Sequence, residues 1–228
     1  MNQFDGQEIK ISAEGTAARI LDAAEVLFAE KGFAGTSARD ITRSAGCNVA
    51  SINYYFSGKD NLYFQVCKRR LNALRELRIT SLNNYMAQNP EDISLEGLLR
   101  NFSRAFLLPL IEEASGRNIM KLLVREMLYP QLPANMIFDE MILPILLVLQ
   151  RAMIKVCPGL DEKRVMWTIF SLVGQLLHTI HIESMLSKHP DEKFSLFFEV
   201  SSAVDHIVAL TVAGVYGQIK NDGEHKDV

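Results

Sequence analysis

The chain has 228 residues, of which 48% are hydrophobic, and its 24 Lys and Arg against 27 Asp and Glu give a net charge of −3. This composition is typical of a globular protein with a sizeable core, and it excludes a generally basic nucleic-acid binder but not a local basic patch. Three cysteines without a CxxC pair indicate a reducing compartment and no disulfide framework. The polar start lacks the pattern of a secretory signal, and the longest apolar stretch is about half of a membrane span, so we expect a cytoplasmic protein.

Apolar spacing predicts helices along the whole chain, and because no segment alternates strictly we expect no β-sheet. A flexible arm over residues 1–13 precedes the first predicted helix, Thr16–Lys31. Two short helices follow, one over SARDITRSA with Thr36 as its N-cap and one over VASINYYF with Asn48 as its N-cap. Two helices of about two turns, joined by Ala-Gly-Cys-Asn, match the helix-turn-helix plan.

The remainder of the chain is predicted to form longer helices, separated by proline and glycine. One is expected to run from Lys59 or Asp60 to Met86. The others are expected at about Ser94–Ala114, Arg117–Leu128, Pro133–Val156, Asp161–Leu186 and Asp191–Gly217, before a flexible tail over residues 220–228.

A motif with several independent positions lies between Thr36 and Tyr63. It reads TSARDI, then AGCN, then ASINYYF, then KDNLY, and it follows an F-x-x-x-G-F run at the end of the first predicted helix. Over roughly residues 14–65 the sequence resembles the TetR family of bacterial transcriptional regulators. It departs from the usual pattern of that family at Thr42, Cys47, Asn53 and Tyr55.

The resemblance implies an all-α fold with two domains. Residues 1–65 would form a three-helix helix-turn-helix DNA-binding domain, and residues 66–228 a larger helical domain for effector binding and dimerisation. The run KLLVREM, followed by Pro130 and by Ile142-Leu143-Pro144, also resembles the C-terminal domain of the CecR type, a TetR subgroup linked to control of drug export. The chain carries no glycine or nucleophile motif of an enzyme, so we expect no catalytic activity and no cofactor.

The second short helix must fit a DNA major groove about 12 Å wide, and the small side chains of Ala50 and Ser51 permit that approach. Asn53 can form a bidentate contact with adenine, and Tyr54 can touch a thymine methyl or a phosphate, so both are expected to read bases. Their neighbours are expected to hold phosphates. The complete predicted DNA-binding set is Thr36, Ser37, Arg43, Asn48, Ala50, Ser51, Asn53, Tyr54, Tyr55 and Lys59. The alternative is that these are caps and surface polar residues of a three-helix subdomain.

The distribution of charge favours the DNA-binding interpretation. Residues 36–78 hold eight basic and three acidic residues, whereas residues 1–35 hold three basic and six acidic ones. The positive stretch therefore coincides with the motif.

The resemblance also implies that the last two long helices pair with those of a second subunit in a four-helix bundle. Their apolar arcs are wider than a single core stripe needs, which an interface would explain, and burial within one subunit is the alternative. The predicted interface residues are Val165, Leu172, Leu176, Ile180, Phe197, Val200, Val204 and Ile207.

Further apolar residues, between this bundle and the DNA-binding domain, are candidates for an effector pocket, with ordinary core packing as the alternative. Among them Arg125 could bind an anionic effector or pair with Glu126 or Asp139. The predicted pocket residues are Leu71, Leu74, Phe102, Phe106, Leu123, Arg125, Met127, Met141, Trp167 and Phe170.

Three other residues allow two interpretations each. His178 and His181 are one helical turn apart and could begin a metal site, but ordinary hydrogen bonding explains them as well and we expect no metal. Cys47, in the turn between the two short helices, could block DNA binding when oxidised or could fill an apolar slot.

These observations predict a homodimeric transcriptional regulator, a repressor, that reads a palindromic DNA operator and releases it on binding a small, largely apolar effector. One alternative is a DNA-binding protein of the same fold that has no effector and is controlled by a protein partner. The other is an enzyme on a helical scaffold.

Overall fold

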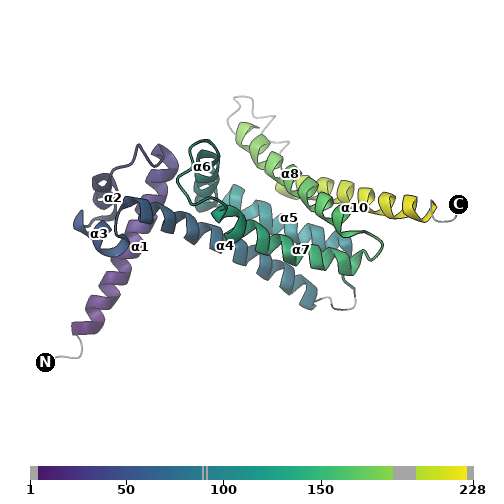
Figure 1. The fold of residues 1–228 in the computed structure, drawn as a ribbon, viewed down its shortest axis with the longest axis horizontal. Coiled ribbons are helices and arrows are strands. Elements are labelled where there is room, and N and C mark those ends of the chain that lie inside the picture. Colours follow the sequence, from purple (N-terminus) through teal and green to yellow (C-terminus); the bar gives the residue numbers. More distant parts are fainter. Residues whose placement is uncertain (1–4, 89, 91, 187–198, 225–228) are drawn as a thin grey trace. The chain divides into compact units, whose positions relative to one another are not determined.

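The computed structural model of the protein describes residues 5–88, 90, 92–186 and 199–224. Helices form throughout these residues, and no strand occurs among them (Figure 1), which confirms the predicted all-α class. The chain divides into two compact units. The first comprises Met1–Asn72 and Ala114–Met136, and the second comprises Ala73–Glu113 and Ile137–Val228.

The first unit contains helices α1 (Asp5–Lys31), α2 (Ala38–Ala45), α3 (Ala50–Phe56), the first part of α4 (Lys59–Gln88) and α6 (Ala114–Leu128). The ring of Phe28 on α1 packs edge-on against Tyr63 on α4, with centroids 5.0 Å apart. Around this pair lie buried apolar side chains from α1 to α4, namely Ile20, Ala24, Ile41, Ile52, Leu62 and Val66. This core holds the two short helices in place.

Helix α1 begins eleven residues before the predicted start at Thr16, so the segment predicted as a flexible arm is helical from Asp5 onward. Its first turns contain Glu, Lys and Ala, which favour helix without producing an apolar stripe. The spacing of apolar residues therefore could not predict these first turns of α1.

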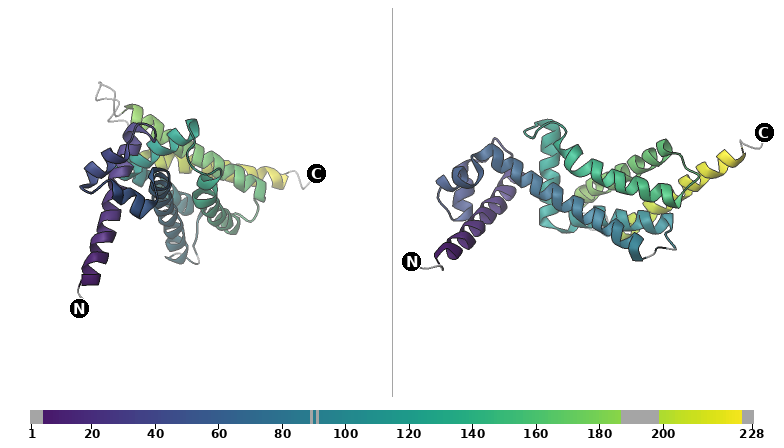
Figure 2. Two further views of the ribbon diagram at one scale, coloured as in Figure 1. Left: turned by 60° about the vertical axis from the view of Figure 1, so that its left-hand side comes forward. Right: turned by 60° about the horizontal axis from the view of Figure 1, so that its bottom comes forward.

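The second unit contains the rest of α4, α5 (Leu95–Glu112), the π-helical turn η1 (Phe138–Ile142), α7 (Leu143–Val156), α8 (Glu162–Leu186) and α10 (Val200–Glu224). Helix α5 packs against α7, α8 and α10, and α7 packs against α8 (Figure 2). The N-cap of α5 is Ser94, whose Oγ accepts a hydrogen bond from the Gly97 amide at 3.0 Å. Ion pairing between Arg100 on α5 and Asp205 on α10 joins two of these helices at the surface.

A single helix was predicted over Pro133–Val156, but the structure has the turn η1 leading into α7. The cause is Pro144, which has no N–H to donate to the carbonyl of Glu140 four residues earlier. That carbonyl accepts a hydrogen bond from Nη1 of Arg75 instead, at 2.8 Å. The last helix begins at Val200 and continues beyond the predicted end at Gly217, and residues 187–198, where its predicted start lies, are outside the described residues.

Candidate nucleic-acid interface

The turn between α2 and α3 is built from two residues with special backbone roles. Gly46 ends α2 in the left-handed conformation, with φ of 64°, which a residue with a side chain adopts only at a cost. The Asn48 side chain then accepts a hydrogen bond from the Ala50 amide at 2.9 Å, although the N-cap position itself is Val49, one residue later than predicted. This turn fixes the direction in which α3 leaves α2.

Helix α3 has one buried side and one exposed side. Ile52 and Phe56 are buried, whereas Asn53 is exposed and Tyr54 is 81% exposed. The Tyr54 ring lies edge-on to that of Tyr55, with centroids 4.8 Å apart. An amide and a phenol therefore project into solvent from a short helix whose other face is anchored, as the reading of base edges requires. Arg43, Asn48 and Ala50 are also exposed.

Thr36 does not lie on this surface, and its predicted role at a phosphate is wrong. It is 1% exposed, and its hydroxyl donates to the carbonyls of Gly32 and Leu27, at 2.8 and 3.1 Å. The N-cap of α2 is the next residue, Ser37. The Thr36 hydroxyl thus binds backbone carbonyls at the end of α1. A sequence motif alone cannot distinguish this role from that of an N-cap.

Ser37 is exposed, but its polar groups are already used inside the protein. Its Oγ accepts from the Asp40 amide at 3.1 Å, and the Asp40 carboxylate accepts from the Ser37 hydroxyl at 2.6 Å and the Ser37 amide at 3.2 Å. These hydrogen bonds from Ser37 hold the pKa of Asp40 below its ordinary value. The carboxylate therefore occupies the start of α2, where a phosphate was expected.

Lys59 begins α4 close to the end of α3. Its ammonium lies 4.1 Å from the centroid of the Phe33 ring, and the Asn61 amide donates to the Phe56 carbonyl at 2.8 Å. The aromatic ring limits the positions that the cation can take without removing it from solvent, since Lys59 is half-buried.

The basic stretch of the sequence is spread over more than one surface. Arg69 and Arg70 both pair with Glu25, a nearly buried carboxylate on α1, at 3.0 and 2.5 Å. Arg75 and Arg78 belong to the second unit. The remaining cations are the exposed Arg39 and Arg43, the half-buried Lys59, and Lys68, which lines a pocket together with Tyr55 and Phe56 at the end of α3. The charge of the stretch as a whole therefore overstates the charge available to DNA.

Helix α6 is fastened to the first unit by two adjacent residues. Glu126 is buried and accepts hydrogen bonds from the Tyr63 hydroxyl at 2.6 Å and from the amides of Gln131 and Leu132 at 2.9 and 3.0 Å. Nη2 of Arg125 donates to the carbonyl of Glu30 at 2.9 Å, at the negative end of the α1 dipole. The observed partner of Arg125 is thus a backbone carbonyl and not the Glu126 or Asp139 carboxylate of the predicted ion pair, whereas its predicted role at an anionic effector stays a prediction.

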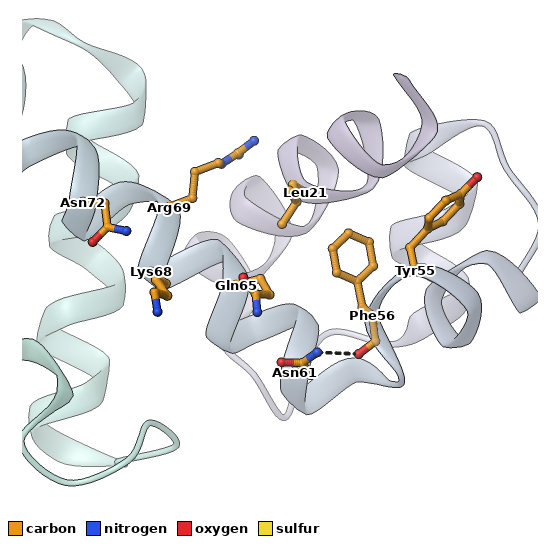
Figure 3. Close-up of a pocket in the computed structure, with 8 residues that line it drawn as sticks. All are labelled: Leu21, Tyr55, Phe56, Asn61, Gln65, Lys68, Arg69 and Asn72. Atoms are coloured by element: carbon orange, nitrogen blue, oxygen red, sulfur yellow. Dashed lines mark hydrogen bonds between the residues drawn. The ribbon is translucent and has the colours of Figure 1, made fainter. Parts of the chain in front are cut away.

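One pocket of about 480 Å³ lies on the first unit (Figure 3). It is open to solvent, and it lies between α1 and the segment from the end of α3 along α4. Its walls combine apolar and polar surface and include two cations. The lining residues are Leu21, Tyr55, Phe56, Asn61, Gln65, Lys68, Arg69 and Asn72, none of which was predicted for the effector.

The predicted effector residues are divided between the two units. Leu71, Leu123, Arg125 and Met127 belong to the first unit and the other six to the second. Trp167 is 62% exposed and Met127 is 85% exposed, and Phe170 is also exposed, so these three line no interior cavity of a single chain. The predicted residues Leu74, Phe102, Phe106 and Met141 are buried in the second unit. Arg78, which was not predicted, contacts two of them, Phe106 and Met141.

The predicted interface residues on α8 and α10 mostly face the interior of one chain. Val165, Leu172, Leu176, Ile180, Val204 and Ile207 are buried, Val200 is half-buried, and Phe197 lies outside the described residues. A second apolar stripe of α8 is exposed, formed by Trp167, Phe170, Leu177 and Met185. On α10 the exposed side carries Leu210 with the small residues Ala213, Gly214 and Gly217.

The imidazoles of His178 and His181 are exposed, with ring centroids 6.4 Å apart. Within the described part of the chain, no group of three or more His, Cys, Asp or Glu side chains is placed to hold a metal ion. Cys47 is half-buried, whereas Cys67 is buried beside Tyr63, and burial raises the pKa of the Cys67 thiol to about 12.

Comparison with known families gives a match to each part of the chain. Residues 20–66 match the family described as bacterial regulatory proteins of the tetR family. Residues 95–215, more than half of the chain, match the C-terminal domain of the HTH-type transcriptional dual regulator CecR.

Individual relatives agree with these matches. The dual regulator CecR of Shigella flexneri is 26% identical over 173 residues, covering 73% of this chain and 76% of that protein. The HTH-type transcriptional regulator YttP of Bacillus subtilis is 36% identical over 81 residues, so the match spans 36% of this chain and 39% of YttP. A crystal structure of a transcriptional regulator from Pseudomonas aeruginosa PAO1 has a TM-score of 0.70 at 16% identity, covering 90% of this chain and 92% of that one, and shows a shared fold.

Proposed function

This chain belongs to the TetR family of bacterial transcriptional regulators and has a CecR-type C-terminal domain, and on that premise we propose that it binds a palindromic operator as a homodimer and releases it when a small, largely apolar effector binds. The family is non-enzymatic, so the alternative of a helical enzyme is withdrawn. A bacterial transcription regulator acts on the chromosome, which places its work in the cytoplasm.

The observation that carries the DNA-binding part is the exposed side of α3. Asn53 and Tyr54 project from a helix whose opposite face, Ile52 and Phe56, is buried in the core of the first unit. We propose that Asn53 and Tyr54 contact base edges and that Arg43, Tyr55 and Lys59 contact phosphates. The small side chains of Ala50 and Ser51 would then let α3 approach the groove closely, and Asn48 would hold the turn that precedes the helix.

The exposed stripes of α8 and α10 support the dimer. By length and composition alone, each helix is long and apolar enough to cross a membrane. Within one chain, however, only 33% of the most apolar segment of α8 and 28% of that of α10 are buried. An apolar surface of this kind is rarely left open to water. A second copy of the same chain would cover it with a matching surface, and two-fold symmetry would then present two copies of α3 to a palindrome.

The division of the chain supports regulation by a ligand. The single helix α4 is shared by both units, and α6 belongs to the first unit although α5 and η1, which flank it in sequence, belong to the second. A ligand that changes the second unit therefore has covalent routes to the DNA-binding unit at both helices. It acts only through its differential affinity for the operator-bound and released conformations.

A second candidate is a regulator that also activates transcription. The matched CecR relative is described as a dual regulator, and this description favours activation at other promoters as a second role beside the repression proposed here. Control by a protein partner in place of an effector is the remaining alternative, and an operator complex that no small molecule dissociates would favour it.

Stoichiometry on DNA tests the proposal. Sedimentation of the protein with a duplex that it selects should give two chains, or a multiple of two, for each palindromic site. A complex of one chain with one half-site, at full specificity, would contradict the dimer.

A further inference from the structure

Arg78 on α4 is a buried cation with no acidic partner. It is 3% exposed, its Nε has no hydrogen-bond partner, and no carboxylate in the described part of the chain pairs with it. Its guanidinium lies 4.0 Å from the centroid of the Phe106 ring, and Nη1 is 3.9 Å from the sulfur of Met141. These contacts replace little of the hydration that a guanidinium loses on burial. Burial lowers the pKa of Arg78 to about 10, which leaves it charged at neutral pH.

Arg75, on the same helix, differs from Arg78 because its guanidinium has partners within the protein. One turn earlier on α4, it is half-buried, donates to the Glu140 carbonyl at 2.8 Å and pairs with the Glu140 carboxylate at 3.5 Å. An acid on η1 is thus available to α4, but it serves Arg75. The guanidinium of Arg78, which is more deeply buried, is the one left without an anion.

A second polar group in the same unit also lacks a partner. Ser103 on α5 is fully buried, and its Oγ has no hydrogen-bond partner. It precedes Phe106 by three residues on the same helix, so both lie on one face of α5. Buried hydroxyls and guanidinium groups are almost always satisfied in folded proteins, so two unsatisfied groups around Phe106 indicate a missing partner.

We propose that Arg78 binds the anionic head group of the effector and that Ser103 donates a hydrogen bond to the same group. The inference rests on the proposed function, because it names the class of effector for the second unit: an apolar molecule with one anionic head, such as a carboxylate. The apolar body would lie among the buried side chains of Phe102, Phe106 and Met141, of which the unbranched methionine is the most adaptable. The π-helical turn that carries Met141 is a feature often found at functional sites.

The variant Arg78→Met tests the role of the charge without any ligand. Methionine keeps much of the length and the apolar contacts, and it removes a buried charge that no anion compensates. The melting temperature of the ligand-free variant should therefore equal or exceed that of the wild type. A melting temperature several degrees lower would show that the guanidinium stabilises the free protein through its contacts with Phe106 and Met141, and the proposal would fall.

Binding of matched probes tests the ligand class. Octanoate and 1-octanol share one chain and differ in charge at the head, as do 1-anilinonaphthalene-8-sulfonate and N-phenyl-1-naphthylamine. In at least one pair, the wild type should bind the anion about tenfold or more tightly than the neutral molecule, and Arg78→Met should abolish that preference. The control Arg104→Met removes an exposed arginine from α5, next to Ser103, and should leave the preference unchanged.

Two results would overturn the assignment: neither pair shows a preference for the anion in the wild type, or the preference survives in Arg78→Met. Operator binding measured on the same proteins separates this inference from the proposed function. If the anion binds through Arg78 but leaves operator affinity unchanged, the ligand class stands and release by an effector does not. If Arg78→Met binds operator as tightly as the wild type does and the anion no longer dissociates the complex, both the ligand class and release by an effector stand.

Discussion

Asn53 and Lys59 belong to the same DNA-binding unit, but their surroundings suit them to different tasks. Asn53 projects from the exposed side of α3. Lys59 is held over the Phe33 ring at the start of α4, where it can meet a phosphate without regard to sequence. We therefore expect one residue to determine specificity and the other to contribute affinity.

The variants Asn53→Ala and Lys59→Met separate these tasks. Asn53→Ala should relax the preference at one base pair in each half-site, by about 1–3 kcal/mol, because a bidentate contact is lost. Lys59→Met keeps an apolar chain on Phe33 and should weaken binding to all sequences alike, with a salt dependence reduced by about one charge. Binding titrations on matched and mismatched duplexes at several salt concentrations measure both effects. Equal loss of specificity in the two variants would contradict the division.

Residue types and spacing predicted the exposed positions of α3 but not the positions that are held by partners at the end of α1. Thr36 and Ser37 are adjacent and both suit a helix start, and only the carbonyls of Leu27 and Gly32 determine that the threonine is buried. Arg125 is 95 residues away from its partner Glu30, so no local pattern could pair them. Sequence reasoning therefore failed where a side chain donates to backbone carbonyls at the end of α1.

At the scale of the element, α6 depends on the buried hydrogen bond between Tyr63 and Glu126. Tyr63→Phe removes the hydroxyl and leaves Glu126 with only the two amide donors of the following loop. The free energy of unfolding should fall by about 1–2 kcal/mol. Urea denaturation measures this, with Tyr54→Phe as the control, since the Tyr54 hydroxyl is on an exposed side chain. Equal stability of the two variants would show that the buried bond contributes little.

The two apolar sides of α8 could be told apart only in the structure. Helical periodicity showed that its apolar arc is wide, and it gave the buried stripe as the interface because both stripes are apolar. The packing of α8 against α5, α7 and α10 decides which stripe is internal. In consequence Leu176 has no exposed surface, whereas the next residue, Leu177, is 44% exposed.

Adjacent charge substitutions test which stripe of α8 forms the interface. Leu177→Glu should yield folded monomers, because it places a carboxylate on the proposed dimer surface. Leu176→Glu should fail to fold, because the same carboxylate enters the core of a single chain. Sedimentation and circular dichroism of the two proteins distinguish these results. A dimeric Leu177→Glu protein would show that the interface lies elsewhere.

At the scale of the whole molecule, the all-α class and the helix-turn-helix were accessible from sequence because they depend on local spacing. The division of the chain was not. The functional boundary at residue 65 stays a prediction, and the first compact unit extends to Asn72 and includes Ala114–Met136. Long-range contacts of α6 with α1 and α4 bring that distant segment into the DNA-binding unit.

Selection of bound DNA from a random pool tests the central claim most directly, since it requires neither the operator nor the effector to be known. The purified protein should enrich an inverted repeat whose half-sites are centred about one turn of DNA, or a small multiple, apart. Asn53→Ala should enrich a repeat of the same spacing with one position relaxed in each half. Enrichment of no sequence, or of a single unpaired half-site, would contradict the account of a dimer that reads DNA with α3.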